Sequence, residues 1–286
     1  MSIRLVSNVA STARETDPRL INPVDVAVHC DKIYVSIPAS NLVQVYSLKC
    51  GRLLHSLTVT TPTGLAFHCN TLYVGSRGGS IFVHGREPSS STMPPSTTPA
   101  QPSMMPTVYL IVPGGGTIEG LTWHKNVLYA TISDRGYVGA FKDKTAIDSI
   151  TNESLFSFSY RPNGIQALDD RIYITYVDGT NSIGSGYVMV YNPKCKSLTN
   201  LIVRDALAYP YGLAMRDDVL LVGNRGTGLI LAYDKRTGQR VENPSRELAL
   251  STNDGLMGMI IEDDKLVSVA ANDNGLMGSV GKIELA

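Results

Sequence analysis

The sequence contains six repeats of a short strand–turn–strand pattern, and this repetition constrains the fold more than any other feature. In each repeat an anchor residue is followed nine positions later by a Tyr, Leu or Val. The anchors are separated by 39, 56, 44, 48 and 46 residues. The nine-residue offset within each repeat is constant, whereas the spacing between anchors varies. This combination indicates rigid hairpins joined by loops of different length. The anchor residues are Asp25, Gly64, Gly120, Gly164, Gly212 and Gly258.

Each repeat continues into further strands. A third strand with a central aromatic or aliphatic residue follows the hairpin, as in YVMVYN and LILAYD, and turn residues then lead to a fourth strand. No stretch shows sustained helical periodicity, so few helices are expected. Four strands in each of six repeats predict an all-β, six-bladed β-propeller that spans residues 1–286 as a single domain.

The two ends of the chain are predicted to meet in one blade. The sixth repeat ends at KIELA, which leaves no room for its fourth strand, whereas Ile3–Ser7 precedes the first repeat and has a strand-like sequence. We therefore expect the N-terminal strand to close the last blade. This pairing would remove an open sheet edge.

Residues 88–106 do not follow the repeat pattern. The segment reads PSSSTMPPSTTPAQPSMMP, with six prolines and no strand alternation, and it accounts for the 56-residue spacing. Such a composition favours an extended, solvated loop. We predict a Pro/Ser-rich insertion in blade 2, either a tolerated surface loop or a segment that binds a partner.

The overall composition excludes some functions. The 25 Lys and Arg balance 25 Asp and Glu, which argues against a main role in binding nucleic acid or an anionic membrane. No apolar run is long enough for a signal peptide or a membrane span, so we expect no membrane insertion. The compartment stays open, but four scattered cysteines favour free thiols and a reducing environment. They are Cys30, Cys50, Cys69 and Cys195.

Several motifs resemble a known family. The segments LVSNVASTARETDPRLINPVDVAV, TPTGLAF, GNRGTGLILAYD and NDNGLMGSVGKIEL resemble an uncharacterised family of six-bladed, NHL-like propellers. Its bacterial members are often secreted, some with a C-terminal sorting signal. The first repeat departs from the usual Trp-Gly of that family by reading Val24-Asp25. The resemblance implies a fold and no activity.

The residues just before the anchors are the candidate channel-lining residues. Inner strands of a propeller surround its central channel, and ligand sites lie where these strands begin. Four of the six preceding residues are polar: Thr63, Glu119, Asn163 and Tyr211. Glu119 and Asn163 could supply oxygen ligands to Ca²⁺ or another divalent cation. The alternative is a water-filled channel without a metal.

The contexts IEGLTW and RPNGIQAL also resemble metal-dependent gluconolactonase-type propellers. That resemblance implies a metal that polarises a lactone carbonyl and activates water. Tyr211 stands where a further Asp or Asn ligand would be expected.

Other chemically active residues are expected to be structural. His29, His68 and His124 all stand four residues after their anchors, and a zinc site would need them to converge. Acidic and amide residues recur in the first turn of the repeats, where they favour turns over acid–base chemistry. They are Asp31, Asn70, Asp169, Asp170, Asp217, Asp218, Asp263 and Asp264.

Three functions remain on sequence grounds. The one we favour is a non-catalytic binding or scaffolding propeller that engages a protein partner or assembly through one face or the blade-2 insertion, without a cofactor. The second is a divalent-metal-dependent hydrolase of the lactonase type. The third is a structural component of a larger particle. Catalytic residues are not identified.

Overall fold

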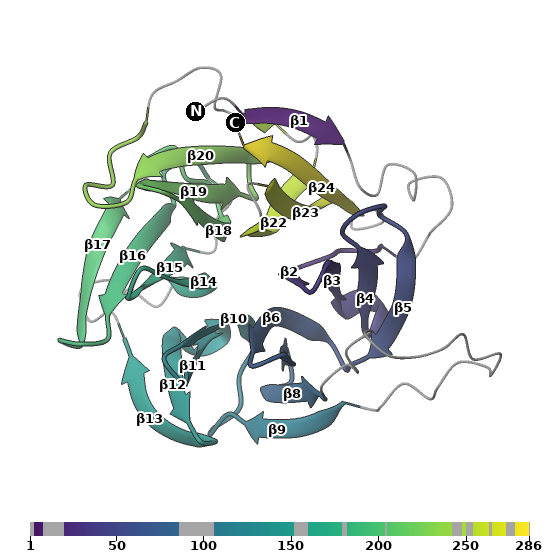
Figure 1. The fold of residues 1–286 in the computed structure, drawn as a ribbon. Helices are drawn as coiled ribbons and strands as arrows, with labels where there is room; N and C mark the ends of the chain where they lie inside the picture. The colour runs from purple at the N-terminus through teal and green to yellow at the C-terminus, as the bar shows by residue number, and fades with distance from the viewer. Residues whose placement is uncertain are drawn as a thin grey trace.

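The computed structural model describes residues 3–7, 20–85, 106–151, 160–178, 182–203, 205–241, 248–249, 254–262, 265–272 and 278–285. Within these residues the strands form six four-stranded antiparallel sheets, arranged as a ring around a central axis (Figure 1). We call each sheet a blade. The predicted all-β propeller with four-stranded antiparallel blades is confirmed.

In each blade the strand nearest the axis is given first. Blade 1 contains β2 (Val26–His29), β3 (Lys32–Ile37), β4 (Leu42–Ser47) and β5 (Leu53–Thr58). Blade 2 contains β6 (Pro62–His68), β7 (Thr71–Ser76), β8 (Ser80–His84) and β9 (Thr107–Ile111). Blade 3 contains β10 (Ile118–His124), β11 (Val127–Ile132), β12 (Tyr137–Lys142) and β13 (Thr145–Ile150).

The second half of the ring repeats this order. Blade 4 contains β14 (Arg161–Leu168), β15 (Arg171–Val177), β16 (Gly186–Asn192) and β17 (Ser197–Val203). Blade 5 contains β18 (Pro210–Arg216), β19 (Val219–Asn224), β20 (Leu229–Asp234) and β21 (Leu248–Ala249). Blade 6 contains β22 (Asp254–Glu262), β23 (Lys265–Asn272), β24 (Gly278–Leu285) and β1 (Ile3–Ser7). Two short 3₁₀ turns, η1 (Pro38–Ser40) and η2 (Ser133–Arg135), follow β3 and β11.

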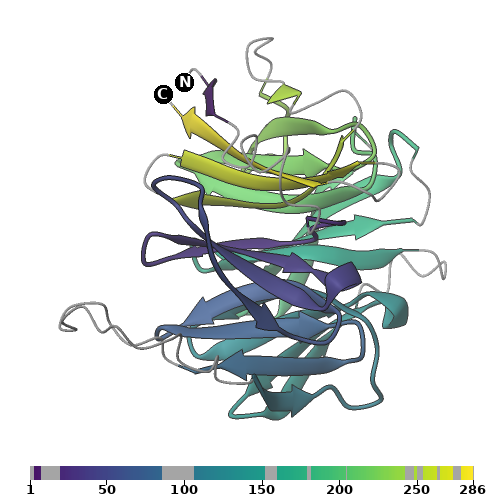
Figure 2. The same cartoon turned by 90° about the vertical axis from the view of Figure 1, so that its right-hand side faces the viewer.

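The N-terminal strand closes the ring as predicted. β1 pairs with β24 in antiparallel register, with Ile3 opposite Leu285 and Ser7 opposite Lys282. Both views place the two termini beside this strand pair (Figures 1 and 2). The blade that contains the C-terminal strands therefore receives its outer strand from the start of the chain.

The hydrophobic core lies between neighbouring blades. Ile81 and Leu110 of blade 2 pack in one cluster with Leu128 and Ile132 of blade 3. β-branched and aliphatic residues suit this position, because each face of a sheet is covered by a neighbouring blade. Burial of one such side chain stabilises the fold by about 1.5–3 kcal/mol.

The polar first turns are confirmed, with a backbone cause. In blade 4 the two turn residues Asp169 and Asp170 have φ of 46° and 61°, and in blade 1 Cys30 and Asp31 have φ of 48° and 58°. Such left-handed two-residue turns match the twist of a hairpin and favour Asp and Asn. The pair Asp263–Asp264 lies outside the described residues.

The anchor glycines permit close contact between inner strands. A Cβ atom on Gly64 would lie 2.7 Å from the backbone of Gly120, and one on Gly258 would lie 2.7 Å from the Cα of Asp25. Real Cβ atoms do not approach other atoms this closely, so a larger residue would push the blades apart. The exception among the anchors is Asp25.

The predicted insertion lies between β8 and β9 of blade 2, and all of it except Pro106 is outside the described residues. In the part of the chain that the structure describes, no helix is long and apolar enough to cross a membrane. The four cysteines are free and exposed. The compartment stays a prediction.

Candidate functional site

A cavity of about 230 Å³ occupies the centre of the ring. It extends from Glu119 and Tyr211, near the start of the inner strands, to Phe67 and Trp123, near their end. Each inner strand is the edge strand of its blade. On the side that faces the channel, its backbone N–H and C=O groups therefore have no partner strand within the blade. Backbone groups and a few side chains therefore form the wall.

Tyr211 and Glu119 cover one end of this cavity. The hydroxyl of Tyr211, on β18, lies 2.9 Å from Oε2 of Glu119 and 3.2 Å from its carbonyl oxygen, on β10. Tyr211 is buried and packs against Val24 and Met257. β10 belongs to blade 3 and β18 to blade 5. The phenol of Tyr211 therefore reaches past blade 4 and across the channel to Glu119.

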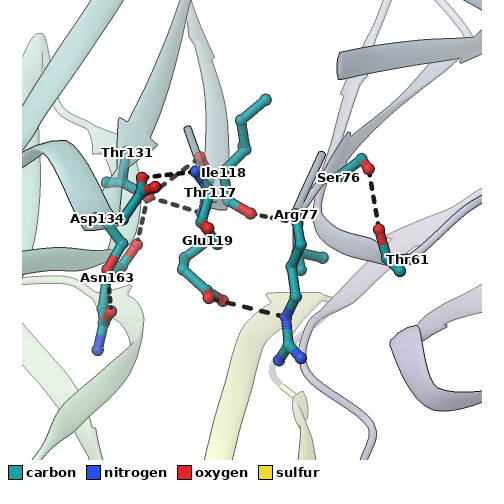
Figure 3. A network of polar contacts seen from close by, with 12 residues as sticks. Thr61, Ser76, Arg77, Thr117, Ile118, Glu119, Thr131, Asp134 and Asn163 are labelled. Carbon is teal, nitrogen blue, oxygen red and sulfur yellow. Dashed lines mark hydrogen bonds and ion pairs between the residues drawn. The ribbon is translucent and has the colours of Figure 1, made fainter. Parts of the chain in front are cut away.

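The carboxyl group of Glu119 is held among cationic neighbours. Burial raises its pKa, while the charges of Arg77 and Arg225 and the Tyr211 hydrogen bond partly oppose this rise. Nε of Arg77 lies 4.0 Å from Oε1 of Glu119, and the two side chains point toward each other (Figure 3). Burial and the carboxyl groups of Glu119 and Asp25 raise the pKa of Tyr211 well above its ordinary value, so the phenol remains a donor.

The other two predicted channel residues do not line the cavity. Thr63 is fully buried and its hydroxyl donates to the carbonyl of Ile118 in the next blade. Asn163 is 2% exposed, and its Oδ1 lies 3.4 Å from the hydroxyl of Ser133. Both side chains therefore serve contacts between blades. Of the four candidates, Glu119 and Tyr211 are the two that line the cavity.

These contacts disfavour the predicted metal pair. The two guanidinium groups near Glu119 would repel a divalent cation, and Asn163 directs its oxygen to Ser133. Among the described residues no group of three or more His, Cys, Asp or Glu side chains is placed to hold a metal. A site at Glu119 and Asn163 stays a prediction, which a calcium titration can test.

Asp25 is the site residue that sequence analysis missed. Its Oδ2 accepts a hydrogen bond from the backbone N–H of Leu65 in blade 2 at 2.8 Å, and its Oδ1 accepts one from Val26 at 2.9 Å. Burial raises the pKa of this carboxyl to about 7, although the two hydrogen bonds act in the opposite direction. The signal was present in the repeat alignment, since this anchor is the one that is not glycine.

Two of the predicted histidines, His29 and His68, lie between blades near the other end of the inner strands. His29 stacks on Phe67 with 4.3 Å between ring centroids, and His68 stacks on Trp123 at the same distance. Each pair joins two neighbouring blades. The imidazoles thus contact aromatic rings of the next blade, and the described residues contain no zinc cluster.

The loops beside these hairpin turns form a face on which several charges are paired with each other. Asp170 forms ion pairs with Lys125 at 2.6 Å and with Lys194 at 3.1 Å, and Lys235 contacts Asp169 at 2.5 Å. Exposed pairs of this kind contribute little to stability, because solvent screens them.

The opposite face, at the Glu119 end, carries three exposed arginines that we call the arginine face. Arg77 follows β7, Arg135 lies in η2 and Arg225 follows β19. Arg225 lies 5.0 Å from the ring centre of Tyr209, and Arg135 donates to the carbonyl of Gly114 at 3.1 Å. Within the described residues neither Arg135 nor Arg225 has a carboxylate at ion-pair distance.

No family model matches the chain. It is 23% identical to uncharacterized protein R648 of Acanthamoeba polyphaga mimivirus, over 98% of this chain and 78% of that protein. It is 22% identical to uncharacterized protein L690 of the same virus, over 97% of this chain and 84% of that protein.

Solved structures share the fold at low identity. The selenomethionine-substituted virginiamycin B lyase from Staphylococcus aureus superposes with a TM-score of 0.63 and 12% identity, covering 98% of both chains. A streptogramin B lyase structure has a TM-score of 0.61 and 14% identity, covering 91% of this chain and 78% of that one. At such identities the likeness concerns the fold alone, and it places the chain among the β-propellers.

Proposed function

We propose that the protein is a non-catalytic binding protein that docks an acidic segment of a protein partner on the arginine face. The observation that carries this proposal is that Arg135 and Arg225 are exposed at the Glu119 end of the ring and have no carboxylate partner among the described residues.

The chemistry of the arginine face suits protein recognition. Arg77 keeps a side chain that is 51% exposed, and its ion-pair partner among the described residues, Glu119, lies 4.0 Å away. Arg225 stacks on Tyr209, which limits the number of rotamers that binding would have to fix. Arginine and tyrosine are enriched among residues that dominate binding energy, and a guanidinium can hold a carboxylate by two hydrogen bonds.

The same face offers little support for hydrolysis. The Glu119 carboxylate already accepts a hydrogen bond from Tyr211 and faces Arg77, so it is poorly placed to act as a metal ligand or a general base. A metal-dependent hydrolase of the lactonase type is therefore the second candidate function. Membership of the uncharacterised NHL-like propeller family remains part of this proposal, and that family brings no activity with it.

The test combines crosslinking with charge reversal. A photo-crosslinking residue at position 77 of the full chain should capture a partner from an extract of the producing cells. The captured protein is then purified, and its affinity is measured for the wild type and for the triple variant Arg77→Glu, Arg135→Glu, Arg225→Glu. We expect the triple variant to bind at least about 100-fold more weakly, because buried arginine contacts contribute about 1–2 kcal/mol or more each.

A matched control reverses charges on the other face. The double variant Lys125→Glu, Lys194→Glu should bind the partner with the wild-type affinity. Equal losses in both variants, or none in either, would refute the arginine face as the docking surface. Light scattering that shows large homo-oligomers without a partner would favour the structural-component function instead.

A further inference from the structure

The outer strand of blade 2 has an open edge that carries no charge. β9 pairs with β8 and is the last strand of its sheet, so its other side presents backbone N–H and C=O groups without a partner strand among the described residues (Figure 1). Its sequence is TVYLI, and no Asp, Glu, Lys, Arg or His occurs anywhere from residue 88 to residue 118. Natural proteins usually protect such an edge with charged side chains, lysine above all.

The outer strands of the other blades show that protection. Each one longer than two residues has a charged or titratable residue within it or directly before it: His55 in β5, Asp148 in β13, Arg4 in β1, and Lys196 before β17. β21 is only two residues long. Among the outer strands that the structure describes, β9 is therefore the one that combines five residues with an absence of charge within the strand and beside it.

β9 also exposes more large apolar side chains than the other outer strands. Val108 is 53% exposed and Ile111 is 65% exposed, whereas β5, β13 and β17 each expose one large hydrophobic residue. Leu110 is buried in the core between blades 2 and 3 and holds the strand in place. β-branched and aromatic residues favour strands. The edge therefore combines free backbone groups and a strong strand propensity with two apolar side chains that a second strand would cover.

We propose that β9 pairs with β9 of a second copy of this chain, antiparallel about a two-fold axis, so that two blades join into one eight-stranded sheet. This inference does not rest on the arginine face. The absence of charge favours a second copy as the occupant, because a two-fold axis sets the strand against itself and would oppose like charges on a charged strand. The charged groups that act on Tyr109 from blade 3 are Lys144, 5.2 Å from the ring centre, and Asp143, and they have opposite signs.

Pairing of β9 with itself limits the association to two chains. Each copy has one β9 edge, and a two-fold pair uses both edges. Pairing of β9 with a different outer strand of the next copy would leave one β9 edge free and would build open filaments. Pro106 and Pro113 flank the segment 107–112 and restrict pairing to it, without removing a donor from the strand. So short an interface implies a weak dimer, with a dissociation constant of about 10–100 µM.

The first experiment measures the mass of the full chain by sedimentation at about 1 µM and about 300 µM. We expect the weight-average mass to rise from that of one chain, 30.8 kDa, toward twice that value. Outward-facing amides of β9 should exchange hydrogen at least about threefold more slowly at the higher concentration. Both measurements need only the wild type. A chain that stays monomeric, or a dimer whose β9 amides exchange equally fast at both concentrations, would overturn the proposal.

The variant Val108→Lys then assigns the interface. A lysine on an edge opposes strand pairing, and the two-fold axis introduces it twice, so the dissociation constant should rise at least about tenfold. The matched control is Ile147→Lys, which places the same charge at a 50% exposed position on β13 of the neighbouring blade and should dimerise like the wild type. Unchanged dimerisation by Val108→Lys, or an equal loss in both variants, would contradict the assignment.

The same measurements test the occupant of the edge. A monomer whose β9 amides become protected only when the partner of the arginine face binds would assign the edge to that partner, and the second-copy inference would be wrong. The triple charge reversal of the arginine face should dimerise like the wild type. A dimer that survives this reversal, together with loss of partner binding, separates the outcome of this inference from that of the proposed function.

Discussion

The hydroxyl of Tyr211 donates a hydrogen bond to Glu119 across the channel, with 2.9 Å between the hydroxyl oxygen and Oε2. The two residues stand in equivalent positions of their repeats, on blades 5 and 3. A long aromatic side chain from one strand thus meets a carboxylate from another and covers the end of the cavity. This contact joins two blades that are not neighbours in the ring.

Tyr211→Phe should therefore destabilise the fold. The substitution leaves the buried Glu119 carboxyl without one donor, which costs about 1–3 kcal/mol. The free energy of unfolding in urea measures the loss. Tyr137→Phe is the matched control, because no hydrogen bond of that hydroxyl is found among the described residues, and it should cost less than about 0.5 kcal/mol.

A double-mutant cycle with Glu119→Gln refines this test. If the two side chains act together, the double variant should be less destabilised than the sum of the single variants by about 0.5 kcal/mol or more. Additive losses, or a Tyr211→Phe cost as small as that of the control, would show that the contact across the channel contributes no stability.

Asp25 predicts a pH dependence of stability with a definite sign. Its pKa is raised from 3.8 to about 7 in the folded protein, so between these values the folded state holds a proton that the unfolded state releases. Stability should fall as pH rises from about 4 to about 7, by at most about 4 kcal/mol. Burial of Glu119 raises that pKa as well and acts in the same direction.

Urea unfolding at pH 5 and pH 7.5 checks this prediction. Asp25→Asn cannot ionise and should lose most of the decline that the wild type shows between these pH values. The exposed Asp217→Asn variant should keep it. A wild-type stability that rises over this range would mean that the carboxylate form of Asp25 is well stabilised by its two backbone donors.

The fold could be predicted well from the sequence, because the residues that recur in each repeat are those that contacts and turns of the backbone favour. Glycine at five of the six anchors lets the inner strands touch, and Asp or Asn recurs in the left-handed turns, so both leave a regular pattern. The side-chain site is different. Thr63, Glu119, Asn163 and Tyr211 occupy equivalent positions, yet side-chain length and the neighbouring blade decide which reaches the channel.

The short side chain of Thr63 donates a hydrogen bond to the carbonyl of Ile118, and that of Asn163 contacts Ser133. The side chain of Tyr211 is long enough to reach Glu119. Such pairing across the ring cannot be read from repeats aligned along the chain. Asp25 was visible as a departure from glycine, but its role depends on the backbone N–H of Leu65 in the next blade. That partner follows from the arrangement of the blades in space.

Removal of residues 1–8 should open the ring. The deletion takes away β1, which pairs with β24 from Ile3 to Ser7. Loss of several backbone hydrogen bonds at about 0.5–1.5 kcal/mol each predicts a cost of about 2–5 kcal/mol. The melting temperature should fall by at least about 5 °C. An unchanged melting temperature would show that the closing pair does not stabilise the ring.

Replacement of Ser89–Met105 by a short Gly-Ser linker should leave the fold intact. β8 and β9 pair directly on either side of the insertion, with Val83 opposite Thr107, so a short connection can join them. The entropy of loop closure varies slowly with loop length, and the melting temperature should change by less than about 2 °C. Marked unfolding would mean that the segment packs against the blade. Loss of partner binding by a folded variant would assign recognition to the insertion.

Calcium should leave the stability of the wild type unchanged. A ligand that binds only the folded state raises the melting temperature by mass action, so a site at Glu119 and Asn163 would reveal itself in a calcium titration followed by thermal unfolding. We expect no shift at millimolar calcium, because Glu119 is engaged by Tyr211 and faces Arg77, while the Asn163 oxygen faces Ser133. Glu119→Gln measured in parallel separates a specific site from a general salt effect. A calcium-dependent rise in the wild type that is absent from Glu119→Gln would reverse this conclusion, and a screen of lactone and ester hydrolysis would then be the next measurement.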